Sequence, residues 1–223
     1  MTCNKMIKST LVIGSTGLVG SSLVQELLDL PNFDSVIVLV RRSVFDSNPK
    51  LREIIFDFEN KDAINDLEPV NHIFCCLGTT IKKAGSKEAF RFVDYELPIQ
   101  FAQWAEKINA DSFSIVTAMG ANSNSSIFYN HVKGEIEKEL KKMDIPKIQI
   151  FQPSLIMGPR KEFRIGEVIG KMFMVLINPL MVGPLKKYRG IHAKTIARGM
   201  VFHLDNSGQG VSVFESDKIG VSI

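Results

Sequence analysis

The run Leu11-Val12-Ile13-Gly14-Ser15-Thr16-Gly17-Leu18-Val19-Gly20 decides the fold of this chain. It places a short apolar strand, a tight turn and the start of a helix in that order. Glycines permit positive φ and close backbone approach, and the exposed amides of a helix N-terminus receive phosphate oxygens. The last glycine lies one turn into the helix and lets the helix pack close to the strand. Taken alone, the pattern also fits a connection that merely needs small residues; at the first strand–helix junction it predicts a dinucleotide-binding site.

Short apolar runs alternate with amphipathic segments behind this turn, which is typical of a parallel sheet covered by helices. We expect strands at residues 8–13, 35–40, 53–56, 72–76, 112–117 and 147–151, and a short one at 210–214. We expect helices at 18–30, 87–108 and 128–143, and another near 193–204. The sequence therefore predicts an α/β fold of Rossmann type, a doubly wound parallel sheet in one domain over residues 1–223. Residues from about 154 to 223 are expected to form a reduced substrate-side region, a small appendage over the sheet edge.

Composition and charge limit the function classes. The chain has 223 residues, of which 45% are hydrophobic and 23% charged, as in ordinary soluble domains. A net charge of +3 is too small to argue for nucleic acid. No stretch reads as a signal peptide or a membrane span, and Cys75 and Cys76 should face opposite sides of a strand, which suits no metal. We expect a cytoplasmic monomer or homodimer with no metal, no nucleic-acid partner and no membrane span.

The end of the second strand distinguishes between the two nicotinamide cofactors. A site selective for NAD normally has an acid there to hold the ribose 2′-hydroxyl, whereas a 2′-phosphate needs a cation. This chain has Arg41 and Arg42, and no acid before Asp46. Two guanidinium groups can pair with a phosphate through bidentate, charge-assisted hydrogen bonds. A solvated pair of loop arginines is the alternative, and the pattern favours NADP(H).

A third pattern, Tyr129-Asn130-His131-Val132-Lys133, suggests chemistry at the nicotinamide end. On a helix, Tyr129 and Lys133 share a face. An ammonium beside a phenol lowers the pKa of the phenol and can hold the nicotinamide ribose, so Tyr129 is a candidate general acid or base. Thr117, twelve residues earlier at the end of the fifth strand, is a candidate for polarising a substrate carbonyl.

These residues resemble the short-chain dehydrogenases/reductases, and within them the atypical group of the Tat-interacting oxidoreductase and its bacterial relatives. The resemblance covers nearly the whole chain and includes the motifs Asp57-Phe58-Glu59, Phe74-Cys75-Cys76-Leu77-Gly78-Thr79-Thr80, Val93-Asp94, Val132-Lys133-Gly134-Glu135 and Gln152-Pro153-Ser154. It implies a sheet of order 3-2-1-4-5-6-7 with the cofactor across its carboxyl edge.

The resemblance also implies residue roles. Asp57 and Phe58 would flank the adenine. Leu77, Gly78 and Thr79, followed by Thr80, would line the adenine ribose and pyrophosphate. Lys133 would hold the nicotinamide ribose, and Pro153 with Ser154 would approach the nicotinamide. Two departures concern catalysis more than cofactor binding: Thr117 replaces the family's Ser, with Ala118 next to it, and Asp94 is the only counterpart of an Asn that supports a proton relay.

The sequence thus predicts an NADP(H)-dependent oxidoreductase of the atypical short-chain type, acting on a small carbonyl or alcohol whose identity the sequence does not specify. The catalytic candidates are Thr117, Tyr129 and Lys133. A non-catalytic NADP(H)-binding sensor or regulator is the alternative hypothesis, favoured by the threonine in place of serine. A sugar-nucleotide epimerase or dehydratase ranks below both, because the region after Pro153 is short for such a substrate.

Overall fold

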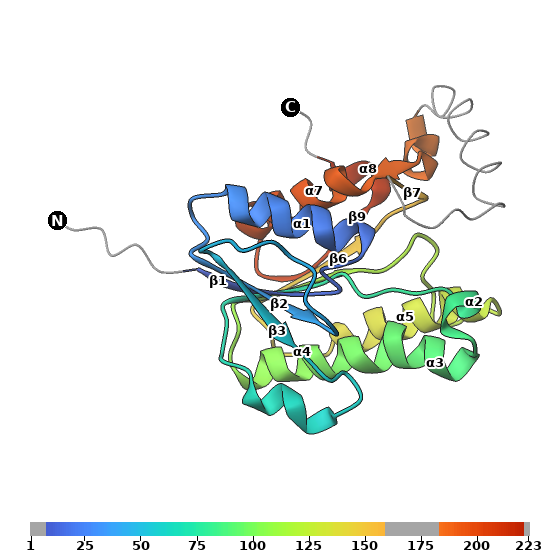
Figure 1. Cartoon of the computed structure of the whole chain (residues 1–223). Helices are drawn as coiled ribbons and strands as arrows, with labels where there is room; N and C mark the ends of the chain where they lie inside the picture. The colour runs from blue at the N-terminus through green and yellow to red at the C-terminus, as the bar shows by residue number, and fades with distance from the viewer. Residues whose placement is uncertain (1–7, 159–182, 221–223) are drawn as a thin grey trace.

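The computed structural model describes residues 8–158 and 183–220. Seven strands form one sheet in the order β3-β2-β1-β4-β5-β6-β9, and every pair in it is parallel (Figure 1). The strands are β1 (Ser9–Ile13), β2 (Ser35–Val40), β3 (Leu51–Ile55), β4 (His72–Cys75), β5 (Ser112–Val116), β6 (Lys147–Gln152) and β9 (Gly210–Glu215). The prediction of a Rossmann-type sheet in this order is confirmed.

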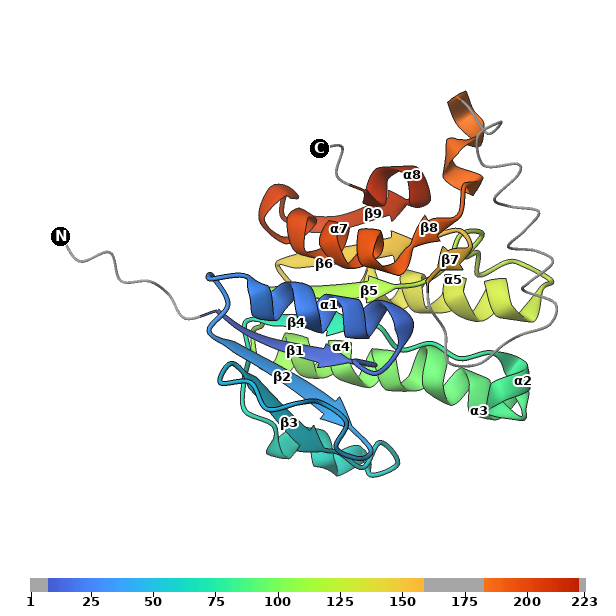
Figure 2. The same cartoon turned by 45° about the horizontal axis from the view of Figure 1, so that its top comes forward.

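Two helical layers cover the sheet. Helices α1 (Leu18–Asp29) and α7 (Ala193–Asn206) lie side by side on one face, and α4 (Leu97–Lys107) and α5 (Phe128–Leu140) cover the other (Figures 1 and 2). Because both faces are covered, all five residues of β5 are buried, and successive side chains enter opposite cores. Ile115 packs into the core under α4 and α5, and Val116 into the core under α1 and α7.

The predicted helix at 87–108 is divided into three parts. It consists of α3 (Lys87–Arg91), a π-helical turn η2 (Phe92–Glu96) and α4. The expected C-terminal appendage also differs. Strand β9 pairs with β6 as the seventh strand of the main sheet, and α7 packs against α1, so this region completes the sheet and one core. Residues 159–182 of the predicted substrate-side region lie outside the described residues.

Short elements fill the remaining connections. They are η1 (Lys61–Asp66), α2 (Ile81–Ala84), β7 (Ile156–Met157), η4 (Gly183–Tyr188), β8 (Ile191–His192) and α8 (Ser216–Ile219). In Figure 2, α2 and α3 lie near the start of α5, at the edge of the sheet where α1 begins. Within the described ranges, no helix has the length and apolar character needed to cross a membrane.

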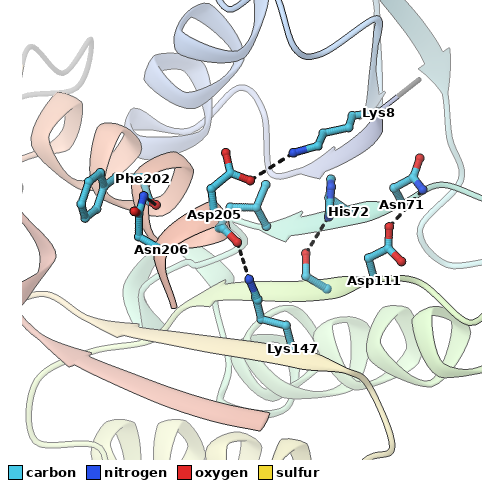
Figure 3. A network of polar contacts seen from close by, with 10 residues as sticks. Lys8, Asn71, His72, Asp111, Lys147, Phe202, Asp205 and Asn206 are labelled. Atoms are coloured by element: carbon cyan, nitrogen blue, oxygen red, sulfur yellow. Dashed lines mark hydrogen bonds and ion pairs between the residues drawn. The ribbon is translucent and has the colours of Figure 1, made fainter. Parts of the chain in front are cut away.

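The amino edge of the sheet carries a polar network, in which the His72–Ser112 pair is buried (Figure 3). His72, 8% exposed at the start of β4, pairs through Nδ1 with the Ser112 hydroxyl at 3.0 Å. Its Nε2 is buried and has no hydrogen-bond partner within the described part of the chain. Nearby, Lys8 forms an ion pair with Asp205 at 3.0 Å, and Lys147 donates to a backbone carbonyl of α7. Burial is the main reason that the pKa of His72 falls to about 4.

Candidate cofactor and catalytic site

Apart from Tyr129 and Lys133, which lie on α5, the predicted site segments directly follow the carboxyl ends of parallel strands, where ligands of open α/β sheets bind. The first of them is the glycine turn after β1. Gly14 has a φ of +77°, and a Cβ there would lie 2.6 Å from the Cys76 carbonyl oxygen. A Cβ on Gly20 would lie 2.2 Å from the Gly14 carbonyl oxygen. Only glycine fits at either position, because larger residues would push α1 away from β1 and β4.

The surroundings of this turn fit a pyrophosphate. The N-cap of α1 is Gly17, which offers no side chain to the free amides of the first turn, and that turn contains no acidic residue. The Ser15 hydroxyl is buried there with no hydrogen-bond partner among the residues that the structure describes. Uncapped amides at a helix N-terminus attract anions. Thr16 and Gly17 are exposed and Leu18 is half-buried, whereas Val19 and Gly20 are buried and serve packing.

Arg41 and Arg42 follow β2 with both side chains exposed, and neither forms a hydrogen bond or an ion pair among the residues described. The nearest strand offers an acid, Glu53, but its carboxylate already accepts hydrogen bonds from the Ser43 hydroxyl and from the Val44 amide at 2.9 Å. These bonds lower the pKa of Glu53. The two guanidinium groups therefore remain available for an anion.

The segments after β3 and β4 differ in how many of their polar groups already form hydrogen bonds within the protein. Asp57 is exposed and accepts a 3.0 Å hydrogen bond from the Glu59 amide, and Phe58 packs edge-on against Phe56 with ring centres 5.0 Å apart. In the loop 77–80, the Thr79 amide donates to Asp94 at 2.8 Å. The Thr80 hydroxyl caps α2. Gly78 is the exposed residue of this loop.

Tyr129 and Lys133 lie on the first two turns of α5. Lys133 Nζ is 2.7 Å from Asp94 Oδ1, and the two side chains are 4% and 1% exposed. Tyr129 packs against Phe90 at a ring-centre distance of 5.7 Å. Burial raises the pKa of Tyr129; the ammonium of Lys133 opposes this and the carboxylate of Asp94 adds to it. The pKa therefore shifts upward, in the opposite direction from our prediction, because burial of the phenol, together with the Asp94 carboxylate, outweighs the lysine charge.

Thr117 does not take the predicted place beside Tyr129. Its hydroxyl donates to Glu137 at 2.6 Å and contacts the Phe151 carbonyl at 3.3 Å, and the residue is 5% exposed. Glu137 lies eight residues after Tyr129, about 12 Å farther along a helix that rises 1.5 Å per residue. Gln152 also donates to this carboxylate, at 2.9 and 3.0 Å. The structure thus assigns the Thr117 hydroxyl to a buried structural cluster.

Pro153 and Ser154, which follow β6, are also tied into the protein. The carbonyl of Pro153 accepts a 2.9 Å hydrogen bond from the Met119 amide. The Ser154 hydroxyl donates to the Arg189 carbonyl and lies 3.0 Å from the Ser216 hydroxyl. These contacts hold the exit of β6 against α8 and occupy the Ser154 hydroxyl.

The sequence-based prediction gave too little weight to Asp94, which it treated only as the counterpart of an Asn in the short-chain dehydrogenases. The signal was present in the sequence: an acid follows Phe92 and Val93 and precedes Tyr95, among the apolar residues of a predicted helix. Ionised side chains are rarely buried without a partner, so such an acid indicates a buried cation nearby.

The fold defines the class of protein: a Rossmann-type α/β fold, shared with solved sugar-nucleotide epimerases. Solved structures with this fold include a UDP-N-acetylglucosamine 4-epimerase from Methanobrevibacter ruminantium, with a TM-score of 0.68, 15% identity, and coverage of 94% of this chain and 76% of that one. WbmH of Bordetella bronchiseptica, solved with NAD+, has a TM-score of 0.69 and 16% identity at the same coverages.

The chain belongs to the HIM1 family, whose family model matches residues 37–177. Protein HTATIP2 of Rattus norvegicus is 27% identical over 207 residues, covering 91% of this chain and 84% of the relative. The mitochondrial protein FMP52 of Eremothecium gossypii is 31% identical over 184 residues, covering 82% and 78%. The predicted resemblance to the atypical short-chain group is confirmed.

The prediction of a cytoplasmic location is wrong by the same comparison. Relatives from Eremothecium gossypii, Scheffersomyces stipitis and Aspergillus niger all carry the word mitochondrial in their names. Our prediction rested on the lack of a stretch that reads as a signal peptide or a membrane span. Neither absence distinguishes the cytoplasm from a mitochondrial location.

Proposed function

We propose that this protein is an NADP(H)-dependent oxidoreductase of the atypical short-chain type, which acts on a small carbonyl or alcohol. The observation that carries the proposal is the pair Tyr129 and Lys133 on the first turns of α5, with the lysine fixed by Asp94 at the carboxyl edge. The glycine turn after β1 supports a dinucleotide at the same edge, through its uncapped amides and the buried Ser15 hydroxyl.

The choice of NADP(H) over NAD(H) rests on Arg41 and Arg42, whose guanidinium groups have no partner within the described ranges. A 2′-phosphate would accept bidentate hydrogen bonds from them. The Arg41→Ser/Arg42→Ser double variant should weaken NADPH binding by about 100-fold or more and leave NADH binding within a few-fold, since two charge-assisted pairs contribute roughly 1.5–3 kcal/mol each. Fluorescence titration with both cofactors measures this; equal losses for NADPH and NADH would refute the assignment.

When bound, the nicotinamide supplies the hydride chemistry, and the protein supplies binding, orientation and a proton. The Tyr129 hydroxyl would donate a proton to the carbonyl oxygen of the substrate, or accept one from an alcohol. Lys133 would hold the nicotinamide ribose with its ammonium, and Ser154 and Pro153 would limit the space on the β6 side.

Tyr129→Phe tests the catalytic part. It removes the proton donor and keeps the ring that packs on Phe90. We expect turnover of a carbonyl panel with NADPH to fall by about 100-fold or more, as for loss of a general acid, while the NADPH dissociation constant changes little. Asn130→Ala, on the same helical turn, is the matched control. Unchanged turnover in Tyr129→Phe would refute the role.

A second candidate function is a non-catalytic NADP(H)-binding sensor. The position of Thr117 favours it, because the hydroxyl that we expected to polarise a carbonyl is bonded to Glu137 instead. Tight NADPH binding without turnover on carbonyl and alcohol panels in either direction would support this function over the first.

A further inference from the structure

Asp94 lies where three segments of the candidate site meet. Its Oδ1 is 2.7 Å from Lys133 Nζ on α5, and its Oδ2 accepts the backbone amide of Thr79, in the loop after β4, at 2.8 Å. The side chain itself comes from η2, between α3 and α4. At 1% exposure, both carboxylate oxygens face these partners and not solvent.

The backbone that presents Asp94 is unusual. Helices α3 and α4 are α-helical, whereas η2 between them is π-helical. A π turn inserts one residue into a helix, and such turns occur frequently at functional sites. Asp94 is the buried residue of η2. Burying an ionised carboxylate is unfavourable unless it is paired, and Asp94 is paired with the Lys133 ammonium and the Thr79 amide.

We propose that Asp94 is a positioning residue, which joins the loop 77–80 and the ammonium of Lys133 into one preformed cofactor-binding unit. The inference rests on the proposed function, because it assigns these two segments to the same dinucleotide. Asp94 need not touch the cofactor: it fixes the Thr79 amide, and hence the loop, and it keeps Lys133 both in place and charged.

The charge state of Lys133 depends on this partner. Burial by itself lowers the pKa of Lys133, but the carboxylate of Asp94 more than compensates, and the pKa is raised above its ordinary value. Lysines buried without an anionic partner have pKa values as low as about 5–6. Asp94→Asn keeps an oxygen that can accept the Thr79 amide and removes only the charge. Lys133 should then lose its proton within the neutral range.

The test is fluorescence titration of NADPH between pH 6 and 9, with Asp94→Asn, Lys133→Met and the double variant compared with the wild type. Wild-type affinity should vary little over this range. Affinity of Asp94→Asn should fall by about tenfold per pH unit above the new lysine pKa, since charged Lys133 is the binding form. Lys133→Met and the double variant should bind weakly with no such slope. Leu140→Ala, a core change on the last turn of α5, controls for general destabilisation and should keep the wild-type profile.

The outcomes separate this inference from the proposed function. If the wild type binds no NADPH, both are overturned. If the wild type binds NADPH, and Asp94→Asn has the same affinity and the same flat profile, only the positioning role is overturned. A slope that persists in the double variant would also overturn it, because the titrating group would not be Lys133.

A second measurement covers the case in which Asp94→Asn does not fold. In wild-type protein labelled with ¹³C at lysine Cε, the resonance that Lys133→Met removes should keep its ammonium shift at pH 10.5, where about half of the exposed lysines have lost their proton. A Lys133 resonance that titrates with the exposed lysines, or before them, would show that Asp94 does not hold its charge.

Discussion

Protonation of His72 should destabilise the folded protein as the pH falls. The pKa of this buried imidazole is about 4 in the folded chain, against 6.5 when the residue is exposed. Between these two values the unfolded chain binds a proton that the folded chain excludes, so stability decreases as the pH is lowered from 6.5 towards 4. Linkage over the interval from pH 7.5 to 5 gives a loss of about 2 kcal/mol from this residue, which is a large share of a typical domain stability.

Urea unfolding followed by circular dichroism at pH 7.5 and 5.0 measures this loss. We expect a decrease of about 1 M in the wild-type midpoint from His72 alone. His72→Asn keeps a polar atom near Ser112 and removes the titration. It should be less stable than the wild type at pH 7.5 but lose about 2 kcal/mol less on acidification. His192→Asn, at an exposed histidine, should retain the wild-type pH dependence. If His72→Asn loses as much stability as the wild type, His72 is not the acid-sensitive group.

Three further predictions concern the site and its supports. Gly20→Ala should abolish NADPH binding in a titration and lower the melting temperature, because its Cβ would lie 2.2 Å from the Gly14 carbonyl oxygen; wild-type affinity would show that α1 can move at no cost. Thr117→Val should reduce the free energy of unfolding by about 1–3 kcal/mol, since the buried Glu137 loses a hydrogen bond, yet change kcat less than threefold; a loss of kcat near that of Tyr129→Phe would restore Thr117 as a catalytic residue. Cys75 should resist iodoacetamide in the native protein at pH 8 and react after unfolding, as judged by peptide mass spectrometry, because burial raises the pKa of its thiol to about 12; rapid native alkylation would contradict the buried assignment.

The predictable parts of the fold are those in which a local sequence pattern is compatible with only one tertiary arrangement. The strand Ser35–Val40 is an unbroken apolar run, and a run of that kind must be covered on both faces, which places it inside a parallel sheet. The glycine turn was predictable for a similar reason: a positive φ at Gly14 and the close approach at Gly20 are backbone requirements that the sequence states directly.

The predictions that the structure corrects are those that depend on how two elements of secondary structure pack against each other. Apolar periodicity runs through 87–108 without a break, so it gave no sign that a π turn would shift the register at Asp94. The separation between Thr117 and Tyr129 in sequence says nothing about where along α5 the end of β5 is placed. That position is set by the packing of Gly134, where a Cβ would lie 2.0 Å from the Ser123 amide nitrogen. The close approach fixes α5 against the loop after β5, and Thr117 then faces Glu137.

The direction of the Tyr129 pKa shift bears on which reaction this site would favour. Because Asp94 balances the charge of Lys133, the phenol is held in its neutral form by burial. A neutral phenol is a proton donor, and reduction of a carbonyl by hydride transfer requires a donor at the oxygen. Alcohol oxidation requires the phenolate, which at this site is populated only at high pH. We therefore expect carbonyl reduction to be nearly independent of pH from 6 to 8, and alcohol oxidation to rise by about tenfold per pH unit up to the pKa of Tyr129. An oxidation rate that no longer rises with pH at pH 7 would mean that Lys133 lowers the pKa of Tyr129 despite Asp94. In that case Asp94 would position only the loop after β4, and not Lys133.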